Sequence, residues 1–215
     1  MLIERINNWI DIKLVIYLLT LSIAILFIPI ASAQEFDTNT APAKTINNLH
    51  VHLLEGMKGG SKLGFQGRFK LLAPIVESSH GLDFILKKIL GGLWTKLDPE
   101  QQKILIDHFH KLSISTYAGW FKKYDNEHFE YIEQKKMPRD YVLVRSQLVR
   151  SSGDTVSLDY LLRKDEIGWR IINVLADGVS DLALKRVEYR TVLEQKGFNV
   201  FVDMLKKKIK LAEEN

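Results

Sequence analysis

Apolar residues recur at helical spacing throughout the first half of the chain. This spacing predicts three helices, at residues 45–57, 65–76 and 81–90, and a glycine-rich connection separates the first two. The strongest helix signal follows Asp98, which can cap, because Pro99 suits the first helical position and Glu100 suits the positive end of the helix dipole. The side chains predicted to form the inward stripe of this helix are Leu105, Phe109, Leu112, Thr116 and Trp120.

The second half of the chain changes to the alternation that is typical of strands. Strands are predicted at residues 129–133, 141–150, 155–163 and 169–176, with hairpin connections at 151–154 and 165–168. The third strand is the clearest, because Val156, Leu158, Tyr160 and Leu162 share one face while the other face is largely polar. The sheet should therefore bury one face, and the helices are its only available cover.

The chain leaves the last strand through Asp177-Gly178, a turn signal, and Ser180 can cap the helix that follows. Two closing helices are predicted, over residues 181–195 and 198–211, with a break at Gly197. The predicted fold class is α+β: a four-stranded antiparallel sheet with helices packed on one face.

The N-terminus has the layout of a secretory signal peptide. Basic Arg5 and Lys13 precede an apolar run over residues 14–30, and Ala31-Ser32-Ala33 offers a small-residue cleavage site. We expect a signal peptide at residues 1–33, a disordered leader at 34–44 and a single domain at 45–215. The alternative is an uncleaved membrane anchor that leaves the domain outside the cytoplasm, since the apolar run reaches the short end of membrane-spanning lengths.

The composition of the chain excludes several kinds of site and partner. The chain has no cysteine, so neither disulfides nor cysteine-based metal sites are available, and stability must come from packing. The net charge of +4 is too small to indicate nucleic-acid binding. The lysines at residues 206–210 form either a solvated helix face or a patch for acidic partners or lipid head groups.

No catalytic or metal-binding motif stands out. The close histidine pairs, His50 with His52 and His108 with His110, are two residues apart on predicted helices and should point in different directions. The sequence contains no zinc-protease, nucleophile-elbow or phosphate-loop motif, and its hairpin carboxylates are explained by turn chemistry. We therefore expect neither an enzyme nor a bound metal or cofactor.

Four stretches carry a resemblance to a known family. They are LGFQGRF at residues 63–69 followed by LAP at 72–74, LSISTYAGWF at 112–121, VSLDYLLR at 156–163, and GWRIINVLADGVS at 168–180. In this order they resemble the MlaC-type, or toluene-tolerance, periplasmic lipid carriers, an auxiliary family of ABC transporters. The first stretch is similar to the hopanoid-biosynthesis-associated branch.

The resemblance implies a periplasmic carrier that moves a phospholipid or hopanoid-type lipid between an inner-membrane ABC transporter complex and an outer-membrane lipoprotein complex. It also implies an NTF2-like or cystatin-like shape that encloses an apolar cavity. The residues predicted to contact lipid are Phe109, Leu112, Trp120, Val142, Val144, Val156, Leu158, Tyr160, Leu162, Ile172 and Val174. The alternatives are ordinary core packing for each of these residues, and an NTF2-like enzyme acting on a hydrophobic small molecule, or a scaffold for membrane complexes, for the protein.

Overall fold

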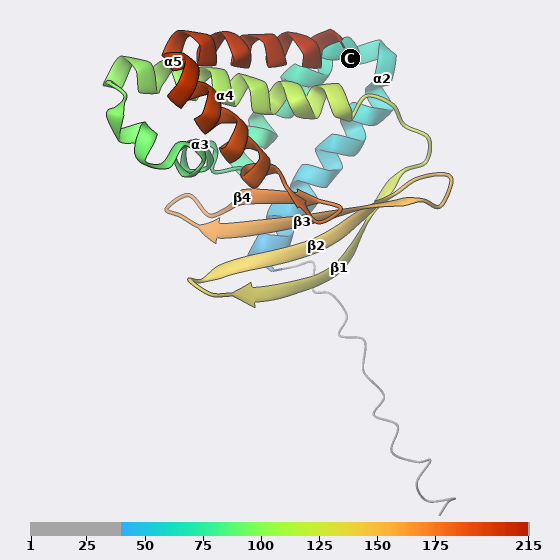
Figure 1. Cartoon of the computed structure of the whole chain (residues 1–215). Helices are drawn as coiled ribbons and strands as arrows, with labels where there is room; N and C mark the ends of the chain where they lie inside the picture. The colour runs from blue at the N-terminus through green and yellow to red at the C-terminus, as the bar shows by residue number, and fades with distance from the viewer. Residues whose placement is uncertain (1–39, 215) are drawn as a thin grey trace, which may run out of the picture. The chain divides into compact units, whose positions relative to one another are not determined.

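The computed structural model of the protein describes residues 40–214 (Figure 1). The predicted signal peptide and the predicted leader up to residue 39 lie outside the described residues. Within 40–214, no helix has both the length and the apolar character needed to cross a membrane.

The first helix, α2 (Ala41–Ser79), contains the first two predicted helices. It begins at Ala41 rather than at residue 45, because the Thr40 side chain accepts a hydrogen bond from the Ala43 amide and Pro42 suits the first turn. Gly60 and Gly64 interrupt it with positive φ angles of 46° and 60°, which glycine adopts without strain. The predicted glycine-rich connection is therefore a kink between two helical segments.

Two further helices lead to the sheet. Helix α3 (Leu82–Leu90) passes into the 3₁₀ turn η1 (Gly91–Lys96), and α4 (Pro99–Trp120) follows. The predicted cap of α4 is confirmed, because the Asp98 carboxylate accepts from the Gln101 amide at 2.8 Å and the Gln101 side chain accepts from the Asp98 amide.

The sheet is antiparallel and has five strands in the order β1-β2-β3-β4-β5 within the described residues, so the prediction of four strands was wrong. The first four strands are β1 (His128–Met137), β2 (Tyr141–Val149), β3 (Thr155–Lys164) and β4 (Trp169–Ala176). The extra strand, β5 (Val179–Ser180), pairs with the end of β4. It forms because Asp177 and Gly178, both with positive φ, reverse the chain in two residues.

Strand β1 is longer than predicted. Its polar second half, which the alternation did not identify as a strand, continues to Met137 and pairs with β2 past an irregularity between Tyr131 and Glu133. Lys135 and Lys136 lie in this segment at the edge of the sheet, where charged residues oppose pairing with another chain.

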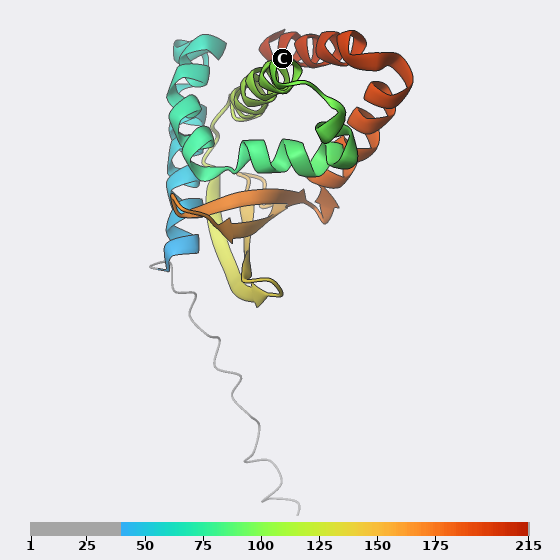
Figure 2. The same cartoon turned by 90° about the vertical axis from the view of Figure 1, so that its left-hand side faces the viewer.

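The last helix, α5 (Asp181–Glu214), is broken at Gly197, which has a φ of 82°, as predicted. Ser180 caps it by accepting from the Ala183 amide at 3.1 Å. The helices lie on one side of the sheet, and the C-terminal half of α5 runs along α4 (Figures 1 and 2).

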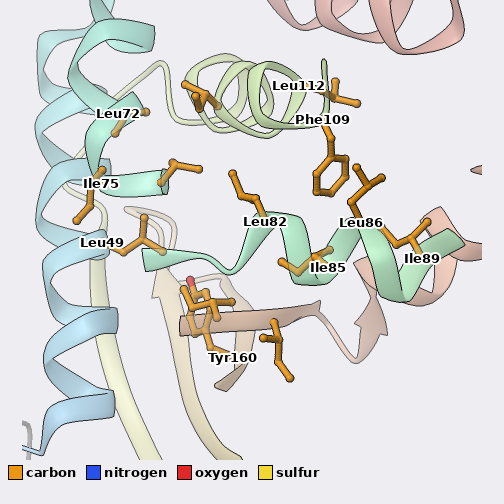
Figure 3. Packing of buried hydrophobic residues seen from close by; sticks show 14 of the residues in the cluster. Leu49, Leu72, Ile75, Leu82, Ile85, Leu86, Ile89, Phe109, Leu112 and Tyr160 are labelled. Carbon is orange, nitrogen blue, oxygen red and sulfur yellow. The ribbon is translucent and has the colours of Figure 1, made fainter. Parts of the chain in front are cut away.

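The core fills the space between the helices and the inner sheet face. Figure 3 shows Leu82 and Leu86 of α3 pointing toward α4, which contributes Phe109 and Leu112. Tyr160 of β3 belongs to the same cluster of buried residues and approaches from the sheet. Such packing supplies the stability that the cysteine-free chain needs.

Candidate functional site

One part of the interface between helices and sheet is not filled. A pocket of about 220 Å³ lies between α4, the start of α5 and strands β3 and β4. Its walls are mainly apolar and include Leu82, Ile85, Phe109, Leu158 and Ile172. The chain therefore offers an apolar ligand a small preformed space beside the sheet.

Part of the predicted lipid-contact set lines this pocket and part does not. The residues in its wall are Phe109, Trp120, Leu158, Tyr160, Ile172 and Val174. Leu112, Val142, Val144 and Leu162 are buried in the packed core, and Val156 is partly buried against it. Their role as lipid contacts stays a prediction.

Trp120 differs from its predicted inward position. Its side chain is 72% exposed and forms part of the pocket rim. Near its C-terminus α4 turns Ser115, Ala118 and Gly119 inward, and a side chain on Gly119 would collide with the Ala212 carbonyl of α5. This close approach of α5 fixes the buried face of α4 and leaves Trp120 at the edge.

A polar pair, His80 and Tyr117, lies in the otherwise apolar wall. The Tyr117 hydroxyl and His80 Nε2 are 2.9 Å apart, and His80 is 4% exposed. Burial lowers the pKa of His80 to about 4, and nearby Arg170 and Lys185 act in the same direction against a hydrogen bond to Val76. Burial also raises the pKa of Tyr117. Both groups are therefore neutral at physiological pH.

The hydrogen bonds of His80 fix its tautomer. Nδ1 lies 3.1 Å from the Val76 carbonyl oxygen, which can only accept, so Nδ1 carries the proton. Nε2 must then accept from the Tyr117 hydroxyl. With its proton directed to His80, Tyr117 offers only oxygen lone pairs to the pocket.

The pocket opens at a rim that is both apolar and charged. Exposed Trp120, Val179 and Leu184 belong to its lining and present apolar surface to solvent. Asp181 and Lys185, one turn apart at the start of α5, also line it and form an ion pair with each other. A molecule with an apolar body and a polar end matches this gradient from wall to rim.

The two close histidine pairs of the sequence do not converge. His50 stacks on Phe129 with ring centroids 3.7 Å apart and places Nε2 3.0 Å from the Tyr160 hydroxyl. His52 and His108 contact backbone carbonyl groups, and His110 contacts Asp83. In residues 40–214, no group of three or more histidine, aspartate or glutamate side chains is arranged to hold a metal ion.

Several polar residues of the pocket lining were not predicted as site residues from the sequence: His80, Ser113, Thr116, Tyr117, Asn173, Asp181 and Lys185. A signal for His80 was present, because it lies between two predicted helices and next to Gly81, where a side chain can turn inward. No local pattern distinguishes Asp181 and Lys185 from an ordinary ion pair on a helix surface.

A second depression of about 1010 Å³ lies between residues 57–62 and residues 122–125. It is more open, and its lining includes four lysines and buried Arg68, which donates to the carbonyl oxygens of Ala118 and Gly60. The lysine charges around this open depression do not suit an apolar ligand, so the pocket beside the sheet is the stronger candidate.

The lysine cluster near the C-terminus is engaged in ion pairs. Lys206 pairs with Asp203 at 3.5 Å, Lys208 with Glu188 at 2.8 Å and Lys210 with Glu214 at 3.6 Å. This pairing favours a solvated helix face over a docking patch.

Similarity to known proteins identifies the family to which the chain belongs. A search of curated protein sequences finds no match. Among solved structures, the phospholipid-binding protein from Ralstonia solanacearum in complex with a phospholipid is similar, with a TM-score of 0.69 and 24% sequence identity. The match covers 79% of this chain and 97% of that one, so the two share a fold. The model of the family described as MlaC protein matches residues 48–207, and the chain therefore belongs to the MlaC family.

Proposed function

We propose that this protein is a periplasmic carrier that binds a phospholipid with its acyl chains in the pocket beside the sheet. The observation that carries the proposal is the gradient of the pocket, from an apolar wall to a rim with the Asp181–Lys185 ion pair. Membership of the MlaC family and the phospholipid bound to the similar Ralstonia protein support it.

The volume of the pocket sets a condition on the proposal. About 220 Å³ is less than the roughly 300–1,000 Å³ that sites for small organic ligands usually provide. A diacyl lipid therefore requires the pocket to widen. Because the pocket lies where α4 and the start of α5 meet β3 and β4, separation of these helices from the sheet would extend an existing gap.

The polar groups of the pocket support binding rather than catalysis. A catalytic base would have to present a free nitrogen, but both ring nitrogens of His80 already have protein partners. The neighbouring Ser79 hydroxyl lies 2.6 Å from the Ile75 carbonyl oxygen and donates to it, so it is not poised as a nucleophile. This arrangement argues against the alternative of an NTF2-like enzyme.

The energetics suit a carrier that both loads and releases lipid. Burial of a methylene group is worth about 0.8 kcal/mol, so roughly thirty of them gain on the order of 20 kcal/mol relative to water. A bilayer offers the same gain. Transfer between bilayer and protein is then nearly balanced, and the direction must come from the complexes at either end.

The proposal extends to these partners and to the lipid. The carrier would move lipid between an inner-membrane ABC transporter complex and an outer-membrane lipoprotein complex, after export by the N-terminal signal peptide. The lipid would be a phospholipid or, in the hopanoid-associated branch, a hopanoid-type lipid. A non-catalytic scaffold for membrane complexes is the competing function, and it would need no lipid in the pocket.

The test is uptake of lipid by delipidated protein. The protein is incubated with phospholipid vesicles, separated from them and analysed by native mass spectrometry. We expect the wild-type protein to carry phospholipid. We expect the Val174→Trp variant to lose uptake almost completely, because the larger side chain would occupy the pocket.

Leu175→Trp is the matched control, since Leu175 is the next residue on β4 and is not part of the pocket wall. It should take up lipid like the wild type, with both variants showing cooperative thermal unfolding. Absence of lipid from the wild-type protein, or equal uptake by Val174→Trp, would contradict the proposal.

A further inference from the structure

We infer that Asp181 and Lys185 form a head-group subsite that selects a zwitterionic phospholipid whose cation is a primary ammonium group. The inference rests on the proposed function and goes beyond it by naming the class of lipid. It follows from the position of the two side chains, from their ion pair with each other and from the polar groups of α4 in the same pocket lining.

The two charges lie where an amphiphile must leave the protein. Both belong to the lining of the pocket, with side chains 47% exposed for Asp181 and 21% exposed for Lys185. Exposed Val179 and Leu184 flank them in sequence and also line the pocket. A lipid with its acyl chains inside would therefore present its phosphate and the attached group at this ion pair.

The ion pair can be opened at little cost. Lys185 Nζ contacts both carboxylate oxygens of Asp181, and within the described residues no other hydrogen bond or salt bridge involves either side chain. A pair with this exposure contributes little to stability because water screens it. Its two charges are therefore available to a ligand that can satisfy both.

A zwitterionic head group satisfies both charges at once. Its phosphate would pair with Lys185, and its ammonium would donate hydrogen bonds to Asp181. A head group that carries only the phosphate charge leaves the Asp181 carboxylate facing an anion. A quaternary ammonium group lacks N–H donors, so it would gain less at this carboxylate than a primary one.

The polar residues of α4 that line the pocket also favour a ligand that donates hydrogen bonds. The hydroxyl groups of Ser113 and Thr116 each donate to a backbone carbonyl oxygen at 2.8 Å, and Tyr117 donates to His80. All three side chains line the pocket, and their oxygens retain lone pairs. An ammonium group at the rim therefore has acceptors from both α4 and α5 in the lining of the same pocket.

The experiment measures which lipid the delipidated protein selects from vesicles of equimolar phosphatidylethanolamine and phosphatidylglycerol. Bound lipids are extracted and quantified by mass spectrometry. We expect the wild-type protein to be enriched in phosphatidylethanolamine relative to the vesicles. Asp181→Asn should lower the bound ratio of phosphatidylethanolamine to phosphatidylglycerol by about two- to fivefold, as for loss of a partly exposed charge contact.

Lys185→Gln should move that ratio in the opposite direction and reduce total loading, because the phosphate loses its cation. Asp203→Asn and Lys206→Gln are matched controls, since these residues form an exposed ion pair outside the pocket, and they should leave the ratio unchanged. A third arm replaces phosphatidylethanolamine with phosphatidylcholine and should show a smaller preference.

The outcomes separate the two proposals. A wild-type protein that loads no lipid contradicts the carrier function and, with it, this subsite. A wild-type protein that loads lipid in the vesicle ratio, or an Asp181→Asn variant with an unchanged ratio, overturns only the head-group selection. Shifts of the same sign in Asp181→Asn and Lys185→Gln would also overturn it, because a general structural effect does not depend on the sign of the charge removed.

Discussion

Leu158 and Leu162 lie on the same face of β3, one near each end of the strand, yet their surroundings differ. Leu162 is fully buried and pairs in register with Ile171 of β4, against which the end of α2 forms a bridge through His80. Leu158 pairs with Ala176, and both line the pocket. The same alternation of apolar residues therefore builds a filled core around Leu162 and a pocket around Leu158, where β5 and α5 begin.

The largest expected effect tests this difference directly. Leu162→Ala should lower the free energy of unfolding by about 2–5 kcal/mol, the cost of a new cavity in a packed core. Leu158→Ala should cost less, about 1–2 kcal/mol, because part of its surface already faces empty space. Chemical denaturation of the delipidated protein measures both.

The stability costs of these two substitutions should also respond differently to bound lipid. Bound lipid would fill the space beside Leu158, so the cost of Leu158→Ala should rise when the protein is loaded. The cost of Leu162→Ala should stay the same. Equal costs of the two substitutions in the delipidated protein would contradict the distinction between a filled and an open end.

The second largest expected effect is a pH dependence of folding stability, which involves one histidine in the pocket wall and one in the core. Burial lowers the pKa of His80, in the pocket wall, to about 4, and that of His50, stacked on Phe129 in the core, to about 3. An unfolded histidine titrates near pH 6.5. The unfolded state therefore binds more protons below pH 6.5, and stability falls as the pH decreases from 6.5 toward 4.

Each histidine should remove up to about 1.4 kcal/mol of stability per pH unit in this window, and none above pH 7. Unfolding free energies measured between pH 7.5 and pH 4.5 give the slope. His80→Asn, which can keep a donor near the Val76 carbonyl oxygen, should reduce this slope by the contribution of one histidine. An unchanged slope in this variant would show that His80 is not buried as a neutral group.

The features that the sequence predicted correctly are mostly local. A cap at Asp98, an interruption between two helical segments within residues 56–67, a break at Gly197 and a turn at Asp177-Gly178 depend on a few neighbouring residues and their backbone preferences. Strand β5 was not predicted, because a strand of two residues is too short to show an alternation of apolar and polar positions. Its existence depends on pairing with β4.

The pocket could be predicted only as a set of candidate side chains. Val144 and Val174 both continue an apolar alternation, but Val144 is fully buried in the core whereas Val174 faces the pocket. Which of them meets empty space depends on how closely each helix approaches, as with α5 against Gly119 and the resulting exposure of Trp120. Contacts of this kind join distant parts of the chain, and periodicity does not encode them.

The smallest expected effect concerns the turn that borders the open end. Gly178 has a φ of 79°, and no atom lies within 4 Å of the place that a β-carbon would take, so Gly178→Ala should cost about 1 kcal/mol through backbone strain alone. Gly92→Ala is the matched control, since its position is equally open but its φ is ordinary, and it should be neutral or stabilise by up to about 1 kcal/mol. Chemical denaturation gives both values, and hydrogen exchange should show faster opening of the β4–β5 hairpin only in Gly178→Ala.

Because Ala176 and Val179 of this hairpin line the pocket, the same variant should change lipid uptake while Gly92→Ala should not. If the two variants behave alike, the geometry of this turn does not contribute to holding the pocket rim in place.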